Sequence, residues 1–195
     1  MTPEAVADYL LGDRIALDPA ALALLERQAG LALPQDYMAF LGLRNGGFTS
    51  PTATEQPALW CGPNTRIEQF YCVTNDAPDW NLTTIRNYRA MTLREWLAET
   101  GGDPAHVPAH WIVFGGNWDG NQLALDLSVE GGEVVWFDHE LLPNEDDNNF
   151  PPDDGMERLG LTFGQFLAAL APPGSPAPKD GFLDRLRGLI GRHPG

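Results

Sequence analysis

Acidic side chains are the most prominent candidates for chemistry in this chain. The densest group stands in a polar stretch without hydrophobic periodicity, residues 141–157. Its members are Glu145, Asp146, Asp147, Asp153 and Asp154. Such a group could dock a basic partner, could bind a hard cation, or could be a solvated loop. The glycine and terminal glutamate of an EF-hand loop are not at the required offsets, and we therefore predict partner docking without a bound metal.

Two further pairs of residues could contact a partner. Trp118 and Asp119 are neighbours in a turn between two expected strands. An exposed Trp beside an acid is typical of the energetic centre of an interface, whereas a Trp folded over the sheet edge would be structural. Asp138 and Glu140 resemble a general acid and base pair, but alternate residues of a strand share one face through periodicity alone. We predict partner contacts for all four residues.

Motifs for enzymatic or metal chemistry are missing from the sequence. His106 and His110 are separated by Pro108, which disfavours one helical metal-binding face. Neither a GxSxG nucleophile motif nor a glycine-rich phosphate loop occurs. We predict no catalytic residues, no cofactor and no metal. The enzymatic alternative is a hydrolase that uses Asp119 or Asp138 with a bound cation.

The charge balance restricts the kind of partner. The 195 residues include 27 acidic and 12 basic ones, which gives a formal net charge of −15. This charge repels phosphate backbones and anionic lipids, so we expect neither direct nucleic-acid binding nor membrane binding. It attracts a basic protein, although acidity could also serve solubility alone.

The compartment follows from two further features. Cys61 and Cys72 are the only thiols and form no metal or redox motif, so both are expected to be reduced core residues. Residues 1–11 show no basic start followed by an apolar run, and no window approaches the roughly 18 apolar residues of a membrane span. We predict a cytoplasmic protein.

The elements that position these residues follow from hydrophobic periodicity and turn signals. Helices are predicted over 19–29, from Pro34 to the Asn45-Gly46-Gly47 stop, over 93–99 and over 161–170. Strands are predicted over 67–73, 111–114, 122–127 and 133–138, and 48–64 is expected to be a loop or an edge strand. Gly131 and Gly132 stand where a hairpin turn is needed. The expected fold is α+β, a central antiparallel sheet flanked by helices.

The predicted domain covers residues 1–170. A proline-rich linker, 171–179, follows it, and a short amphipathic helix over 180–195 ends the chain. The apolar stripe of this last segment is interrupted by arginines. It could pack on the domain, meet a partner or lie on a membrane surface.

Several motifs in order along the chain resemble the SUKH superfamily, which includes bacterial immunity proteins and fungal cell-wall-assembly regulators. They are LPQDYMAFL at 33–41, NGG at 45–47, WIVFG at 111–115, DGNQLALDL at 119–127, VVWFDHE at 134–140 and LTFGQFL at 161–167. Residues 48–110 carry no such motif. The resemblance implies a single α+β domain, and most of the motif residues fit structural roles.

The same resemblance implies an immunity role. Proteins of this kind bind a toxin domain stoichiometrically, and many such toxins are nucleases with basic substrate-binding surfaces. An acidic inhibitor can occupy such a surface by matching its charge. The expected partner is therefore a cognate protein toxin, such as a basic nuclease. The alternative is a regulatory scaffold or adaptor that holds a host protein.

Overall fold

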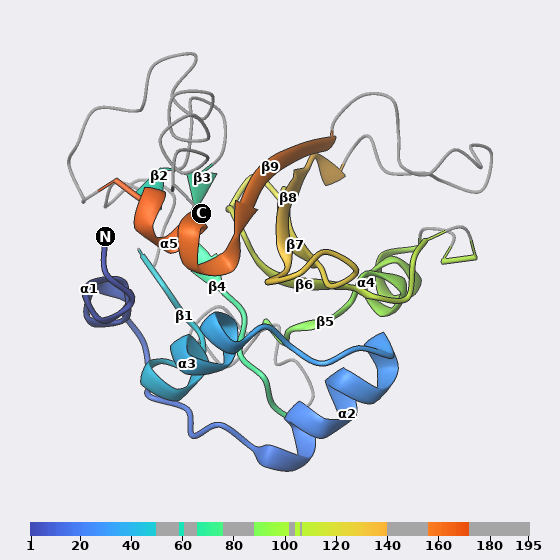
Figure 1. Ribbon diagram of the computed structural model, residues 1–195, viewed down its shortest axis with the longest axis horizontal. Coiled ribbons are helices and arrows are strands. Elements are labelled where there is room, and N and C mark those ends of the chain that lie inside the picture. The colour runs from blue at the N-terminus through green and yellow to red at the C-terminus, as the bar shows by residue number, and fades with distance from the viewer. Residues whose placement is uncertain are drawn as a thin grey trace, which may run out of the picture.

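The computed structural model describes residues 1–49, 59–60, 66–75, 88–101, 104–105, 107–139 and 156–171. Within these residues the chain forms five helices and nine strands (Figure 1). The helices are α1 (Pro3–Tyr9), α2 (Pro19–Ala29), α3 (Gln35–Leu43), α4 (Leu93–Thr100) and α5 (Phe163–Ala169). The strands are β1 (Gly47–Phe48), β2 (Leu59–Trp60), β3 (Arg66–Ile67), β4 (Gln69–Phe70), β5 (Met91–Thr92), β6 (Trp111–Gly116), β7 (Gln122–Asp126), β8 (Glu133–Phe137) and β9 (Met156–Thr162).

Local side chains explain where most helices begin. Thr2 and Asp18 cap α1 and α2, and each is followed by a proline at the first helical position. Thr92 and Thr162 begin α4 and α5 through capping boxes, in which the threonine and the residue three positions later satisfy each other's backbone N–H groups. Gly30, in a left-handed conformation, ends α2.

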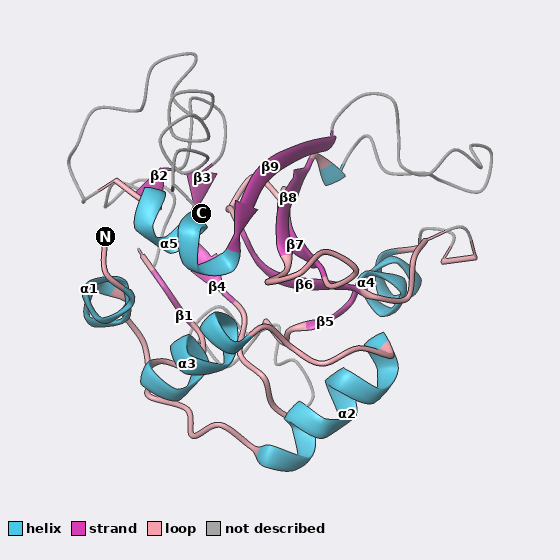
Figure 2. Cartoon of the chain, in the orientation of Figure 1, coloured by secondary structure: helices cyan, strands magenta, loops and turns pink. Residues whose placement is uncertain are grey.

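The central sheet has seven strands in the described part of the chain. Its order is β1-β4-β6-β7-β8-β9, with β5 also pairing to β6, and every strand pair is antiparallel. Figure 2 shows β6 to β9 as consecutive neighbours. Strands β6, β7 and β8 correspond to the ranges predicted from the sequence, whereas β9 was not predicted as a strand. A separate two-stranded ribbon joins β2 and β3.

Helices cover both faces of this sheet. Every residue of β7 is buried, so neither face of the central strand meets solvent. Phe114 of β6 packs against Phe163 and Phe166 of α5, with ring centroids 5.4 and 5.9 Å away. Phe137 of β8 packs instead against Trp96 of α4, at 6.0 Å. Figure 1 shows α1, α3 and α5 grouped on one side of the sheet and α4 on the other.

The expected α+β fold is therefore confirmed, with corrections to individual elements. The helix predicted over 161–170 begins only at Phe163, because residues 156–162 form β9. The alternation of buried and exposed residues in β9 is short, since it includes only the buried Leu159 and Leu161. Gly160 between them, with a φ of 65°, interrupts the strand pattern. The strand predicted over 67–73 is divided at Glu68, where the chain passes from the β2 partner to the β1 and β6 partners.

Other parts of the prediction were incomplete or remain outside the described residues. Helix α1 was not predicted, although Thr2 and Pro3 carry the same start signal as the second helix. The range 48–64 contributes both an edge strand, β1, and the short β2. The proposed linker beyond residue 171 and the C-terminal helix over 180–195 lie outside the described part.

Candidate partner-binding surface

The turn between β6 and β7 is a closed hydrogen-bonded loop. The backbone N–H of Asn117 donates to the carbonyl of Asn121, and the Asn117 Oδ1 accepts from the Asn121 N–H, both at 3.0 Å. Gly120, with a φ of 96°, supplies the left-handed conformation that closes the turn. Trp118 and Asp119 therefore occupy fixed positions at its tip.

A buried acid connects this turn to the rest of the sheet. Glu68 lies between β3 and β4 and is 2% exposed. Its Oε2 accepts a hydrogen bond from the backbone N–H of Trp118 at 2.8 Å. A charge-assisted bond to a buried carboxylate is stronger than one between neutral groups, so Glu68 holds the turn against the strand junction.

The end of β8 lies directly against the same turn. The Asn121 Oδ1 accepts from the backbone N–H of His139 at 3.4 Å and lies 3.2 Å from its Nδ1. Asp138 is beside this ring, with its Oδ1 3.8 Å from the Nδ1. Residues 117–121 together with Asp138 and His139 are called the turn surface from here on.

The structure thus brings together three of the residues predicted from sequence. Asp119 is exposed and the Asp138 side chain is 30% exposed, so both carboxylates can meet a partner. Trp118 is half-buried, and among the described residues its buried indole Nε1 has no hydrogen-bond partner. The remaining predicted residues lie outside the described part: Glu140, Glu145, Asp146, Asp147, Asp153 and Asp154.

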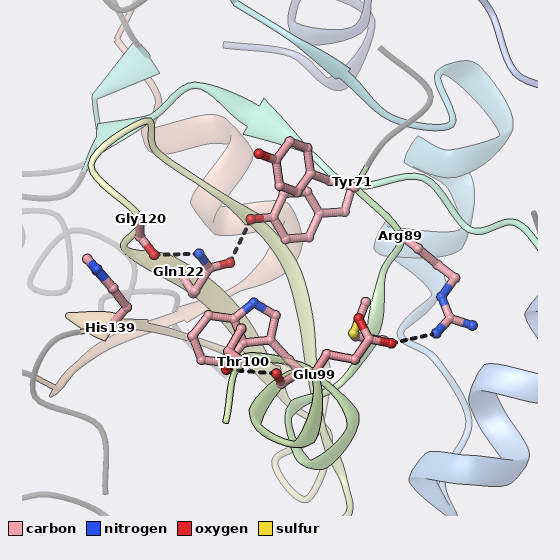
Figure 3. A pocket seen from close by; sticks show the side chains of 10 residues that line it. Tyr71, Arg89, Glu99, Thr100, Gly120, Gln122 and His139 are labelled. Carbon is pink, nitrogen blue, oxygen red and sulfur yellow. Dashed lines mark hydrogen bonds and ion pairs between the residues drawn. The ribbon is translucent and has the colours of Figure 1, made fainter. Parts of the chain in front are cut away.

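A hollow of about 190 Å³ opens beside the turn surface. Figure 3 shows Gly120 and His139 on one side of it, and the ion pair of Arg89 with Glu99 on the other. The residues around it are Tyr71, Tyr88, Arg89, Met91, Trp96, Glu99, Thr100, Gly120, Gln122 and His139. They come from α4, from the β4 and β5 segments, and from the ends of β7 and β8.

A second polar cluster lies at the opposite end of β7. Asp126 is 2% exposed and accepts hydrogen bonds from Ser128 and from Arg158, the latter at 2.9 Å. Burial alone would raise the pKa of Asp126, but these hydrogen bonds and the charge of Arg158 lower it below its ordinary value. Arg158 also binds Glu133 at 2.5 Å and lies over the ring of Trp111. This cluster joins β7, β8 and β9 and is structural.

The described residues contain no group of three or more His, Cys, Asp or Glu side chains that could hold a metal ion. His110 lies 3.5 Å from Asp126 and so belongs to the structural cluster, and His106 is outside the described part. Cys72 is buried, as expected of a core residue, and Cys61 is outside the described part. None of the described helices has the length and apolar character needed to cross a membrane.

Sequence reasoning missed two features of this region. Glu68 was not singled out, although an acid inside the largely apolar segment 67–73 is a signal for a buried role. The hollow was not predicted, because its walls come from segments distant in the chain, such as Tyr71, Trp96 and Gln122. Only the folded sheet brings them together.

The fold and this surface define a class of single-domain α+β proteins with helices on both faces of an antiparallel sheet. The model of the SMI1 / KNR4 family (SUKH-1) matches residues 16–169, which is most of the chain. The protein therefore belongs to the SMI1 / KNR4 family, within the SUKH superfamily that the motifs indicated. Comparison with curated proteins and with solved structures gave no match.

Proposed function

We propose that this protein is a non-enzymatic, immunity-type protein that binds a protein toxin stoichiometrically and neutralises it. The observation that carries the proposal is membership of the SMI1 / KNR4 (SUKH-1) family over most of the chain. The net charge of −15 supports a basic partner such as a nuclease, since charge complementarity speeds encounter and suppresses wrong partners.

The turn surface is the proposed contact region. Its backbone is fixed by Glu68 and by the Asn117 and Asn121 bonds, so it would lose little conformational freedom on binding. Asp119 and Asp138 provide negative charge there, and Trp118 provides a large apolar ring. Glu140 and the acids of 145–154 follow this surface in the chain, and we include them in the proposed contact.

The proposal is tested by coexpression with toxin domains encoded beside the gene. Growth should be rescued by the wild-type protein, and the two purified chains should form a complex. In calorimetry, Asp119→Lys should weaken that complex about tenfold, because a repulsive charge then faces a basic surface. Glu130→Lys is the matched control, since Glu130 is exposed in the β7–β8 turn at the other end of the sheet. The proposal would be overturned if the protein rescued growth from none of these toxins.

A regulatory scaffold that holds a host protein is the second candidate. The same family assignment favours it, and the same surface would serve it. The two functions predict different partners. If the protein neutralised no toxin but formed a complex with a housekeeping protein, the scaffold function would be favoured.

A further inference from the structure

The hollow beside the turn surface has a size suited to one side chain. Its volume of about 190 Å³ is below that of ordinary small-molecule sites, which measure roughly 300 to 1,000 Å³. An apolar protein cavity of about 150 Å³ accommodates a benzene molecule. The hollow can therefore take a single aromatic ring.

The lining favours a ring over a charged group. Tyr71 and Tyr88 stack at 5.1 Å between centroids and, with Trp96 and Met91, surround the space with aromatic carbon and a thioether. Aromatic rings and sulfur make favourable contacts with another ring.

Most polar groups around the hollow already have partners, whereas the buried Nε of Arg89 has none among the described residues. The Tyr71 hydroxyl donates to the Gln122 Oε1 at 2.6 Å, and the Gln122 Nε2 donates to the Gly120 carbonyl at 2.5 Å (Figure 3). Arg89 and Glu99 lie 3.5 Å apart as an ion pair. A cationic guest would meet the charge of Arg89 and would have to compete for Glu99, whereas a neutral ring disturbs neither bond.

The position of the hollow indicates whose ring enters it. Gly120 and His139 belong both to its wall and to the turn surface, and each is next to an acid, Asp119 or Asp138. A basic protein that docks on these acids would present its neighbouring side chains to the hollow. Aromatic residues that fill such pockets often dominate interface energies.

We propose that this hollow is the anchor site for one neutral aromatic side chain, Trp, Tyr or Phe, that projects from the basic surface of the protein partner. The inference rests on the proposed function. It adds a specificity element, because charge alone would admit any basic protein, whereas the hollow requires a ring at a fixed distance from the acids.

The first test uses small probes on the full chain. Indole and p-cresol, followed by amide NMR, should shift signals around the hollow, with a dissociation constant on the order of 1 mM for so few atoms. Thr100→Trp should abolish the shifts by filling the hollow from the end of α4. Ala98→Trp, at an exposed position of α4 that does not line the hollow, should leave them unchanged.

Two probe results would overturn the proposal. One is tighter binding of n-butylguanidinium or n-butylammonium than of indole, which would assign the hollow to a basic side chain. The other is the absence of indole binding. Because a Thr100→Trp chain that failed to fold would also lose binding, its amide spectrum must retain wild-type dispersion. Trp96→Ala, which removes a wall, provides a second variant and should weaken indole binding several-fold.

The second test separates this inference from the proposed function. Thr100→Trp should lower the affinity for the neutralised toxin at least tenfold, and Ala98→Trp should not. If the wild-type chain neutralises the toxin and Thr100→Trp binds it equally well, the anchor site is wrong and the proposed function stands. If the wild-type chain neutralises no toxin, the proposed function fails whatever indole does.

Discussion

At the scale of single residues, two buried acids, Glu68 and Asp126, have structural roles. Glu68 holds the turn that carries Trp118 and Asp119, and Asp126 joins three strands through Ser128 and Arg158. Acids in strands are disfavoured unless they face solvent or receive hydrogen bonds, and Asp126, the last residue of β7, is buried and receives hydrogen bonds. The sequence alone could not distinguish these two situations, since the donor Arg158 is 32 positions away.

The lowered pKa of Asp126 gives a prediction about stability and pH. Folded Asp126 binds its proton less readily than the unfolded residue, whose pKa is about 3.8. The stability it contributes is therefore full above that pH and is lost as the pH falls through the lower folded pKa. Asp126→Asn should cost about 1 to 2 kcal/mol of unfolding free energy at pH 7, and this difference should shrink below pH 3.8.

Urea unfolding across the pH range measures this effect. Asp119→Asn makes the same chemical change at an exposed position and should move the unfolding free energy by less than about 0.5 kcal/mol. If the loss of unfolding free energy in Asp126→Asn stayed constant as the pH fell below 3.8, the charge of the Asp126 carboxylate would not contribute to stability.

At the scale of elements, two glycines in contrasting surroundings are informative: Gly115 lies between close strands, and Gly42 lies in a helix. A Cβ on Gly115 of β6 would lie 2.6 Å from the backbone carbonyl oxygen of Gln69 in β4. At Gly42 of α3, which is exposed, no atom outside its chain neighbours and its own helix backbone lies within 4 Å of the corresponding position. The same substitution should therefore have opposite effects at the two sites.

Thermal or urea unfolding of Gly115→Ala and Gly42→Ala checks this contrast. Gly115→Ala should lose about 1 to 3 kcal/mol through a contact that backbone atoms cannot easily relieve. Gly42→Ala should raise the unfolding free energy by about 0.5 to 1 kcal/mol, because alanine has a higher helix propensity than glycine. Equal stabilities for the two variants would contradict the strand register at Gly115.

Sequence patterns predicted elements well where local signals were complete. The capping side chain and proline at 18–19 and the alternation around 122–127 led to the right helix and strand. The patterns failed where tertiary pairing decides. Strand β9 contains Gly160 and relies on β8 for its register, and Glu68 divides what looks like one strand because its two halves have different partners.

The candidate site was predictable in part for the same reason. Trp118, Asp119 and Asp138 could be chosen because they adjoin strand ends, where side chains reach the surface. The hollow could not, since it depends on Tyr71, Gln122 and α4 meeting across the sheet. Long-range contacts of this kind leave no periodic signal in a single sequence.

At the scale of the whole molecule, the net charge of −15 sets how a partner is met. Association with a basic toxin should slow as salt rises, because screening shortens the range of attraction to about 8 Å at physiological ionic strength. The dissociation rate should change less, because the aromatic anchor is uncharged. Stopped-flow association at about 50 and 500 mM salt checks this, and a salt-independent association rate would contradict electrostatic steering.

The central claim is stoichiometric neutralisation of a protein toxin. Its most direct test is a titration of the toxin's activity with the purified chain at a toxin concentration well above the dissociation constant. Activity should fall linearly and reach zero at one chain per toxin. Undiminished activity at excess chain would contradict binding, and complete loss at far less than one chain per toxin would contradict a non-enzymatic mechanism.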